Sequence, residues 1–120
     1  MNNTVLGLDK TKVEELNKSL NELLANFQVY YQNLRGLHWN IKGKSFFELH
    51  VKFEELYTDS QEKIDMIAER ILTLEGHPLH TFKDYTDLAK VPVGKNIYND
   101  TKSVELVVSS LSELIYIERD

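Results

Sequence analysis

The sequence predicts an all-α protein: a bundle of long helices in which one long connection joins the second long helix to the third. Two long segments, residues 11–38 and 45–75, repeat apolar side chains at intervals of three and four, as one face of a helix does. Both prolines lie between Gly76 and Asn99, and a third helical pattern follows them. No segment shows the alternation of apolar and polar residues that is typical of a strand.

The first helix is expected to begin at Asp9 or Thr11, whose side chains can accept hydrogen bonds from the first helical turn. Its apolar face consists of residues at helical spacing: Val13, Leu16, Leu20, Leu23, Leu24, Phe27, Tyr30, Tyr31, Leu34 and Leu37. The second helix is expected to begin at Ser45, because Ser45-Phe46-Phe47-Glu48 has the S-x-x-E pattern of a capping box. Gly76 followed by Pro78 indicates its end.

The connection after Gly76 is too long for a tight hairpin, so we expect a crossover that contains a short helix around residues 82–89. A third long helix is expected to follow, with Asp100 or Thr101 as its N-terminal cap and helical spacing of apolar residues up to Asp120.

Composition limits the class of protein. A chain of 120 residues fits one domain spanning 1–120. It has no cysteine, which excludes disulfides and thiolate metal sites and fits a reducing cytoplasm. No apolar run approaches the length of a membrane span and no N-terminal signal pattern is present, so we expect a soluble cytoplasmic protein. The net charge of −5 argues against tight binding to nucleic acid.

Five residues with metal-binding side chains fall at regular intervals: His38, His50, Glu54, Asp65 and Glu69. His50 and Glu54 are four residues apart, as are Asp65 and Glu69, so each pair projects from one helical face and can share an ion. Both pairs lie on the same face, but about 16 Å apart along the axis, so one ion cannot contact both. Two copies of this helix packed antiparallel about a two-fold axis would bring the first pair of one copy to the second pair of the other. The spacing therefore suggests a metal site at a dimer interface.

His38 can supply a further nitrogen if the turn at residues 40–44 folds the first two helices side by side. Two imidazoles and three carboxylates form a ligand set that suits iron, manganese or zinc. Two plainer interpretations stay open, because carboxylates four residues apart are usually a solvated helix face and a single histidine usually packs or lies on the surface. A structural helical dimer that binds no metal is thus one alternative. The apolar neighbours of Asp65 and Glu69 favour the metal site, since acids beside apolar surface are costly unless paired.

Three segments of the chain resemble the Dps family, the mini-ferritins named as DNA-binding proteins from starved cells. They are Leu37-His38-Trp39-Asn40, the run from Phe46 to Tyr57, and Asp65-Met66-Ile67-Ala68-Glu69-Arg70. The resemblance covers nearly the whole chain and implies a ferritin-like four-helix bundle. Ordinary ferritins instead carry Glu-x-x-His motifs inside one bundle, and this sequence has none.

The resemblance also implies a function. Members of the family bind iron and act as ferroxidases. The resemblance therefore implies that this protein oxidises Fe(II), preferably with hydrogen peroxide, and so protects against oxidative damage. It assigns His38, His50 and Glu54 of one subunit, with Asp65 and Glu69 of its partner, to the catalytic metal site. Twelve such subunits form a hollow shell that stores Fe(III), so a homo-oligomer is expected.

The sequence departs from the family at two points. Position 54 is commonly aspartate, and Glu54 is longer by one methylene, although we expect it to remain a ligand. Family members also continue through a fourth long helix that this sequence lacks. We therefore expect a C-terminally truncated bundle with an exposed apolar groove, which leaves shell formation open. The alternative function is non-catalytic compaction of DNA under stress, and the acidic charge balance argues against it.

Overall fold

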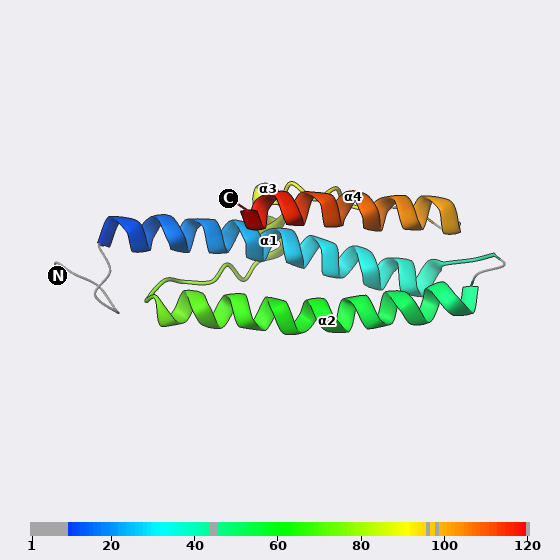
Figure 1. The fold of residues 1–120 in the computed structure, drawn as a ribbon, viewed down its shortest axis with the longest axis horizontal. Helices are drawn as coiled ribbons and strands as arrows, with labels where there is room; N and C mark the ends of the chain where they lie inside the picture. Colours follow the sequence, from blue (N-terminus) through cyan, green and yellow to red (C-terminus); the bar gives the residue numbers. More distant parts are fainter. Residues whose placement is uncertain (1–9, 44–45, 96, 98, 120) are drawn as a thin grey trace.

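The computed structural model describes residues 10–43, 46–95, 97 and 99–119, which form four helices (Figure 1). These are α1 (Lys10–Asn40), α2 (Phe46–Thr73), α3 (Phe82–Leu88) and α4 (Asp100–Arg119). The described residues contain no strand, so the predicted all-α bundle with a long crossover is confirmed. Helix α4 at the C-terminal end is the third of the predicted long helices, and the described residues hold no fourth long one.

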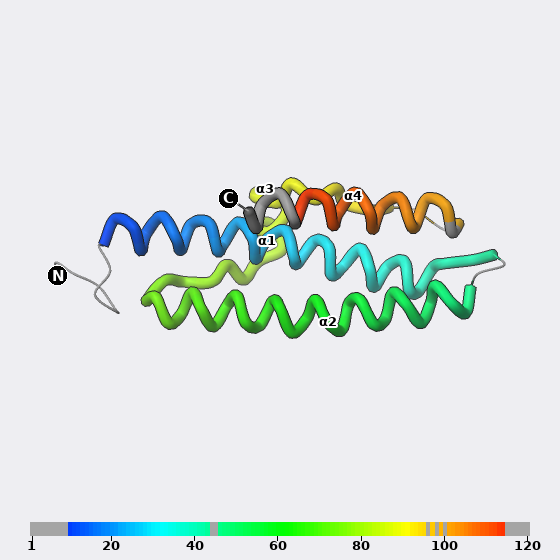
Figure 2. The backbone as a smooth tube through the Cα atoms, viewed as in Figure 1, coloured from blue at the N-terminus to red at the C-terminus, as the bar shows by residue number. Residues whose placement is uncertain are grey.

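Helix α1 lies in the middle of the bundle. In Figure 1 it is flanked by α2 and α4, and it contacts every other helix. The colours of Figure 2 show that α2 and α4 both run antiparallel to α1 and therefore parallel to each other. The chain must travel back along the bundle between Thr73 and Asp100, which is why a long crossover replaces a hairpin.

The core is built around α1 because that helix is covered on more than one side. Buried apolar residues of α2 and α4 pack against it: Phe53, Ile64, Ile71, Val107 and Leu114. Tyr30 of α1 is also buried, and this burial, together with the negative charge of Asp59, raises the pKa of Tyr30 to about 12. None of the helices in the described part of the chain has the length and apolar character needed to cross a membrane.

Asparagines of α1 hold the crossover against the helix, and they follow its course from residue 74 to residue 94: Asn17, Asn21, Asn26 and Asn33. A side-chain amide carries both donors and an acceptor, so it can replace the backbone partners that an irregular segment lacks. The fully buried Asn26 accepts hydrogen bonds from the backbone N–H groups of Lys90 and Val91 at 2.7 and 2.8 Å. The irregular parts of the crossover on either side of α3 are thereby fixed against α1.

The start of α4 differs by one residue from the prediction. Asn99 is the cap, because its Oδ1 accepts a hydrogen bond from the backbone N–H of Lys102 at 2.9 Å. The expectation of Asp100 or Thr101 as the cap was therefore wrong. For the other helices, Thr11 lies inside α1, and the caps expected at Asp9 and Ser45 lie outside the described residues.

The end of α2 lies close to the predicted stop at Gly76, but the residue that turns the backbone is not the glycine. Glu75 adopts the left-handed backbone conformation, with φ of 62°, and the N–H of Gly76 donates to the carbonyl of Ile71 at 2.9 Å. Gly76 is needed for a different reason, since a Cβ there would lie 2.7 Å from the side chain of Asn17. The helix ends where expected, but the strained residue is a glutamate.

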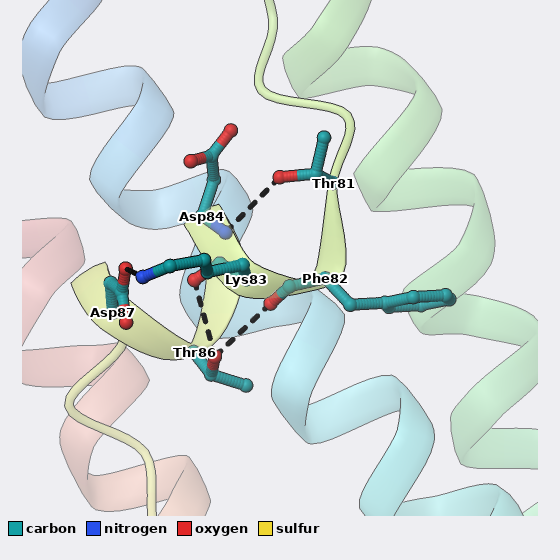
Figure 3. A network of polar contacts seen from close by, with 6 residues as sticks. All are labelled: Thr81, Phe82, Lys83, Asp84, Thr86 and Asp87. Atoms are coloured by element: carbon teal, nitrogen blue, oxygen red, sulfur yellow. Dashed lines mark hydrogen bonds and ion pairs between the residues drawn. The ribbon is translucent and has the colours of Figure 1, made fainter.

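Helix α3 is stabilised by local polar contacts, shown in Figure 3. The hydroxyl of Thr81 accepts a hydrogen bond from the backbone N–H of Asp84 at 3.2 Å and caps the helix. Lys83 and Asp87 form an ion pair at 2.6 Å, one helical turn apart. Phe82 projects away from α3 and is 85% exposed.

Candidate metal site

The turn between α1 and α2 brings two of the predicted ligands together. His38 lies in the last turn of α1 and His50 in the second turn of α2. The N–H of Ile41 donates to the carbonyl of Leu37 at 3.0 Å, so the last turn of α1 continues into the connection, and Ile41 is buried. The two helices then run side by side, as expected from the turn at residues 40–44.

His38 and His50 are joined by two reciprocal hydrogen bonds, and we call this pair of residues the histidine clasp. Nδ1 of His38 lies 2.6 Å from the backbone carbonyl oxygen of His50, and Nδ1 of His50 lies 2.7 Å from the carbonyl oxygen of His38. The two rings are stacked, with centroids 3.6 Å apart and planes inclined by 16°. His38 is buried and His50 is partly buried. Two residues twelve positions apart thus form one rigid unit.

The hydrogen bonds of this histidine clasp fix which nitrogen is free. A carbonyl oxygen can only accept, so each Nδ1 must carry a proton and donate it. In the neutral imidazole, Nε2 then has an available lone pair, which is the form in which histidine binds metals. Both histidines therefore offer an Nε2 donor on the side of the ring away from the hydrogen-bonded backbone.

Glu54 completes the part of the site that one chain provides. Its Oε1 lies 3.9 Å from Nε2 of His38, and its side chain is 57% exposed. Aromatic residues form the walls: Phe46 stacks on His50 with ring centroids 5.1 Å apart, and Tyr57 meets His38 edge-on at 5.4 Å. The donors are thus held by packing on one side and open to solvent on the other.

Asp65 and Glu69 lie on α2 beyond this group, and both are exposed. Their distance from Glu54 along the helix axis, about 16 Å at the standard rise, keeps them from the ion that the clasp would hold. In the described part of this single chain, no three histidine or acidic side chains come together in a metal-binding arrangement. The structure thus brings His38, His50 and Glu54 near one another and leaves Asp65 and Glu69 apart, on an exposed helix.

Sequence reasoning missed the clasp and its aromatic walls. The spacing of the histidines carries no information about hydrogen bonds between side chains and backbone. Phe46 and Tyr57 did leave a signal, because they stand four residues before and seven residues after His50 and so share its helical face.

Comparison with known proteins agrees with this picture. Residues 17–116 match the family model of the ferritin-like domain. A DNA protection during starvation protein from Porphyromonas gingivalis is 42% identical over 96% of this chain and 72% of its own length. The chain belongs to the Dps family.

The structural comparison gives the same assignment. The Dps protein of Vibrio cholerae O1, described as a member of a broad superfamily of ferritin-like diiron-carboxylate proteins, matches with a TM-score of 0.97 and 48% identity over the whole of this chain. The chain covers 76% of that protein, and 57% of an uncharacterized Haemophilus influenzae protein to which it is 50% identical. Several of its relatives are thus considerably longer.

Proposed function

We propose that this protein oxidises Fe(II) with hydrogen peroxide at a site shared between two subunits and sequesters the Fe(III) product, thereby limiting oxidative damage. The observation that carries the proposal is the histidine clasp, which presents two preorganised Nε2 donors beside a carboxylate. In this proposal His38, His50 and Glu54 of one subunit and the partner's Asp65 and Glu69 are the ligands. Fe(II) is the substrate.

The donor set fits iron chemically. Imidazole and carboxylate bind Fe(II), and the carboxylates also bind and neutralise the harder Fe(III) that forms. Glu54, Asp65 and Glu69 are exposed in the single subunit, so a cation from solvent can reach their carboxylates. The family assignment supports iron over zinc or manganese for the same ligands.

The reaction balances without a radical. Two Fe(II) ions each lose one electron, and one hydrogen peroxide accepts both and is cleaved to two hydroxide ions. A single Fe(II) can supply only one electron and would release a hydroxyl radical. A site where carboxylates from two chains meet can hold two irons close together, which favours the two-electron path.

The same proposal includes assembly and location. A two-fold dimer is the smallest unit that completes the site, and a twelve-subunit shell in the cytoplasm is the assembly expected for storage. The close relationship to Dps proteins supports both.

The proposal is tested by metal binding and by oxidation kinetics. Calorimetric titration with Co(II), an air-stable probe, should give stoichiometric binding for the native chain and at least tenfold weaker binding for His50→Ala and Asp65→Ala. Fe(II) oxidation by peroxide should slow in both variants. His77→Ala, which changes an exposed histidine in the crossover, is the matched control and should behave as the native chain. Unchanged binding and rates in the first two variants would remove these residues from the site.

A gel-shift assay distinguishes the proposed function from the alternative, which is compaction of DNA without catalysis. The net charge of −5 predicts no shift at moderate salt. A shift that persists there, together with absent iron oxidation, would favour the DNA-binding alternative.

A further inference from the structure

The exposed face of α2 that carries Glu54, Asp65 and Glu69 also carries large apolar side chains with no role in metal binding. Phe47 is 79% exposed, Val51 is 54% exposed and Leu72 is 59% exposed. At 100° per residue, these six residues fall within an arc of about 60° around the helix. The face is therefore one continuous surface, apolar at both ends and acidic between them.

If the metal ligands of two subunits are to meet, this face can pair with the same face of the partner in one register only. The proposed pairing places His50 opposite the partner's Glu69, and Glu54 opposite the partner's Asp65. In both pairs the residue numbers add up to 119, so each residue of α2 faces the residue whose number completes that sum. Under the same rule Phe47 faces the partner's Leu72. The pairing of the metal ligands alone defines this register, so the match of Phe47 with Leu72 is an independent observation.

We propose that Phe47 and Leu72 form an intersubunit apolar cap that sets the register of the α2–α2 dimer and closes the outer end of each metal site. This inference rests on the proposed function and adds the residues that determine the partner's position. The occupant of the exposed face is a second copy of this chain.

Phe47 is also linked to the site within its own subunit. Its ring meets Phe46 edge-on, with centroids 5.2 Å apart, and Phe46 in turn stacks on His50. Contact with the partner's Leu72 therefore continues the aromatic wall of the histidine clasp across the interface. Along the dimer axis the cap lies directly outside the pair of His50 and the partner's Glu69, where it excludes water from that end of the site.

The cap removes a large exposed apolar area that is otherwise unfavourable in water. Burying a phenylalanine or leucine side chain is among the larger favourable contributions to an interface, particularly beside polar groups that it shields. Because the two-fold axis generates the contact twice, each substitution acts at both ends of the dimer.

Sedimentation velocity over a range of protein concentrations tests the cap. Phe47→Ser and Leu72→Ser should each raise the dissociation constant of the dimer at least tenfold. Phe82→Ser is the matched control, because this phenylalanine is equally exposed but lies on α3, and it should change the constant less than twofold. Since Phe47 and Leu72 are exposed in the subunit, circular dichroism should show an unchanged helix content in all three variants.

A charge exchange tests direct contact. Phe47→Lys and Leu72→Glu should each weaken the dimer. The double variant should have a dissociation constant at least tenfold lower than either single variant, because each lysine then faces a glutamate of the partner. A double variant no tighter than either single one, or a native chain that stays monomeric, overturns the inference.

These outcomes are distinguishable from failure of the proposed function. A dimer that responds as described but binds no Co(II) or Fe(II) leaves the cap in place and removes the metal site. A dimer that binds and oxidises iron normally while Phe47→Ser and Leu72→Ser have no effect removes the cap alone.

Discussion

Replacement of Asn26 by alanine should destabilise the protein more than any other change to a polar residue of α1. Asn26 is fully buried and accepts two hydrogen bonds from the crossover, from Lys90 and Val91. Its loss leaves two backbone N–H groups without partners, at about 1–3 kcal/mol each. The better helix propensity of alanine offsets about 0.7 kcal/mol. We expect the free energy of unfolding to fall by about 3 kcal/mol.

Urea denaturation followed by circular dichroism measures this change, and hydrogen exchange locates it. The amides of Lys90 and Val91 should lose protection first. Asn40→Ala is the control, because Asn40 is exposed and its Nδ2 donates only to the carbonyl of Gly36, within its own helix. It should cost less than about 1 kcal/mol. A loss below 1 kcal/mol for Asn26→Ala, or unchanged protection of the two amides, would refute the role of this side chain in holding the crossover.

Two further predictions concern stability. Tyr30 has a pKa raised from 10.0 to about 12, so the stability that its neutral form contributes is complete below pH 10 and is lost as the pH rises through 12. The native chain should therefore lose about 2–3 kcal/mol more than Tyr30→Phe between these pH values, measured by urea denaturation, and equal losses would contradict the shift. Glu75→Gly should raise the free energy of unfolding by about 0.5–1 kcal/mol, because glycine adopts the positive φ of 62° without strain. A thermal melt checks this, and a lowered melting temperature would show that Glu75 is not strained.

The helices could be predicted from the sequence because their apolar spacing is regular and because proline and glycine mark the crossover. The crossover's path could not be predicted. It depends on asparagines such as Asn26 and Asn33, which in the sequence are polar residues on a helix like any other, while their partners lie more than fifty residues away. The cap of α4 was missed by one residue because Asn99, Asp100 and Thr101 are all acceptable capping residues.

For the candidate site, the sequence suggested that His38 could join His50 if the turn at residues 40–44 folds the first two helices side by side, and the two rings do lie together in the structure. Helix geometry placed Asp65 and Glu69 too far along the axis to reach the same ion within one chain. Spacing could not predict the mutual hydrogen bonds, because these require each imidazole Nδ1 to come within about 3 Å of the other residue's backbone carbonyl oxygen, which depends on how the turn packs. The metal itself and the contribution of the second subunit remain proposals.

Complementation between two inactive variants tests the shared site most directly. His50→Ala and Asp65→Ala each inactivate both sites of their own dimer. In a hybrid dimer, however, the intact His50 of one subunit meets the intact Asp65 of the other, so one of the two sites is restored. Refolding an equal mixture of the two variants should therefore recover about a quarter of the native Co(II) sites and of the iron oxidation rate. No recovery from a mixture shown by mass spectrometry to contain hybrid dimers would contradict a site built from two chains.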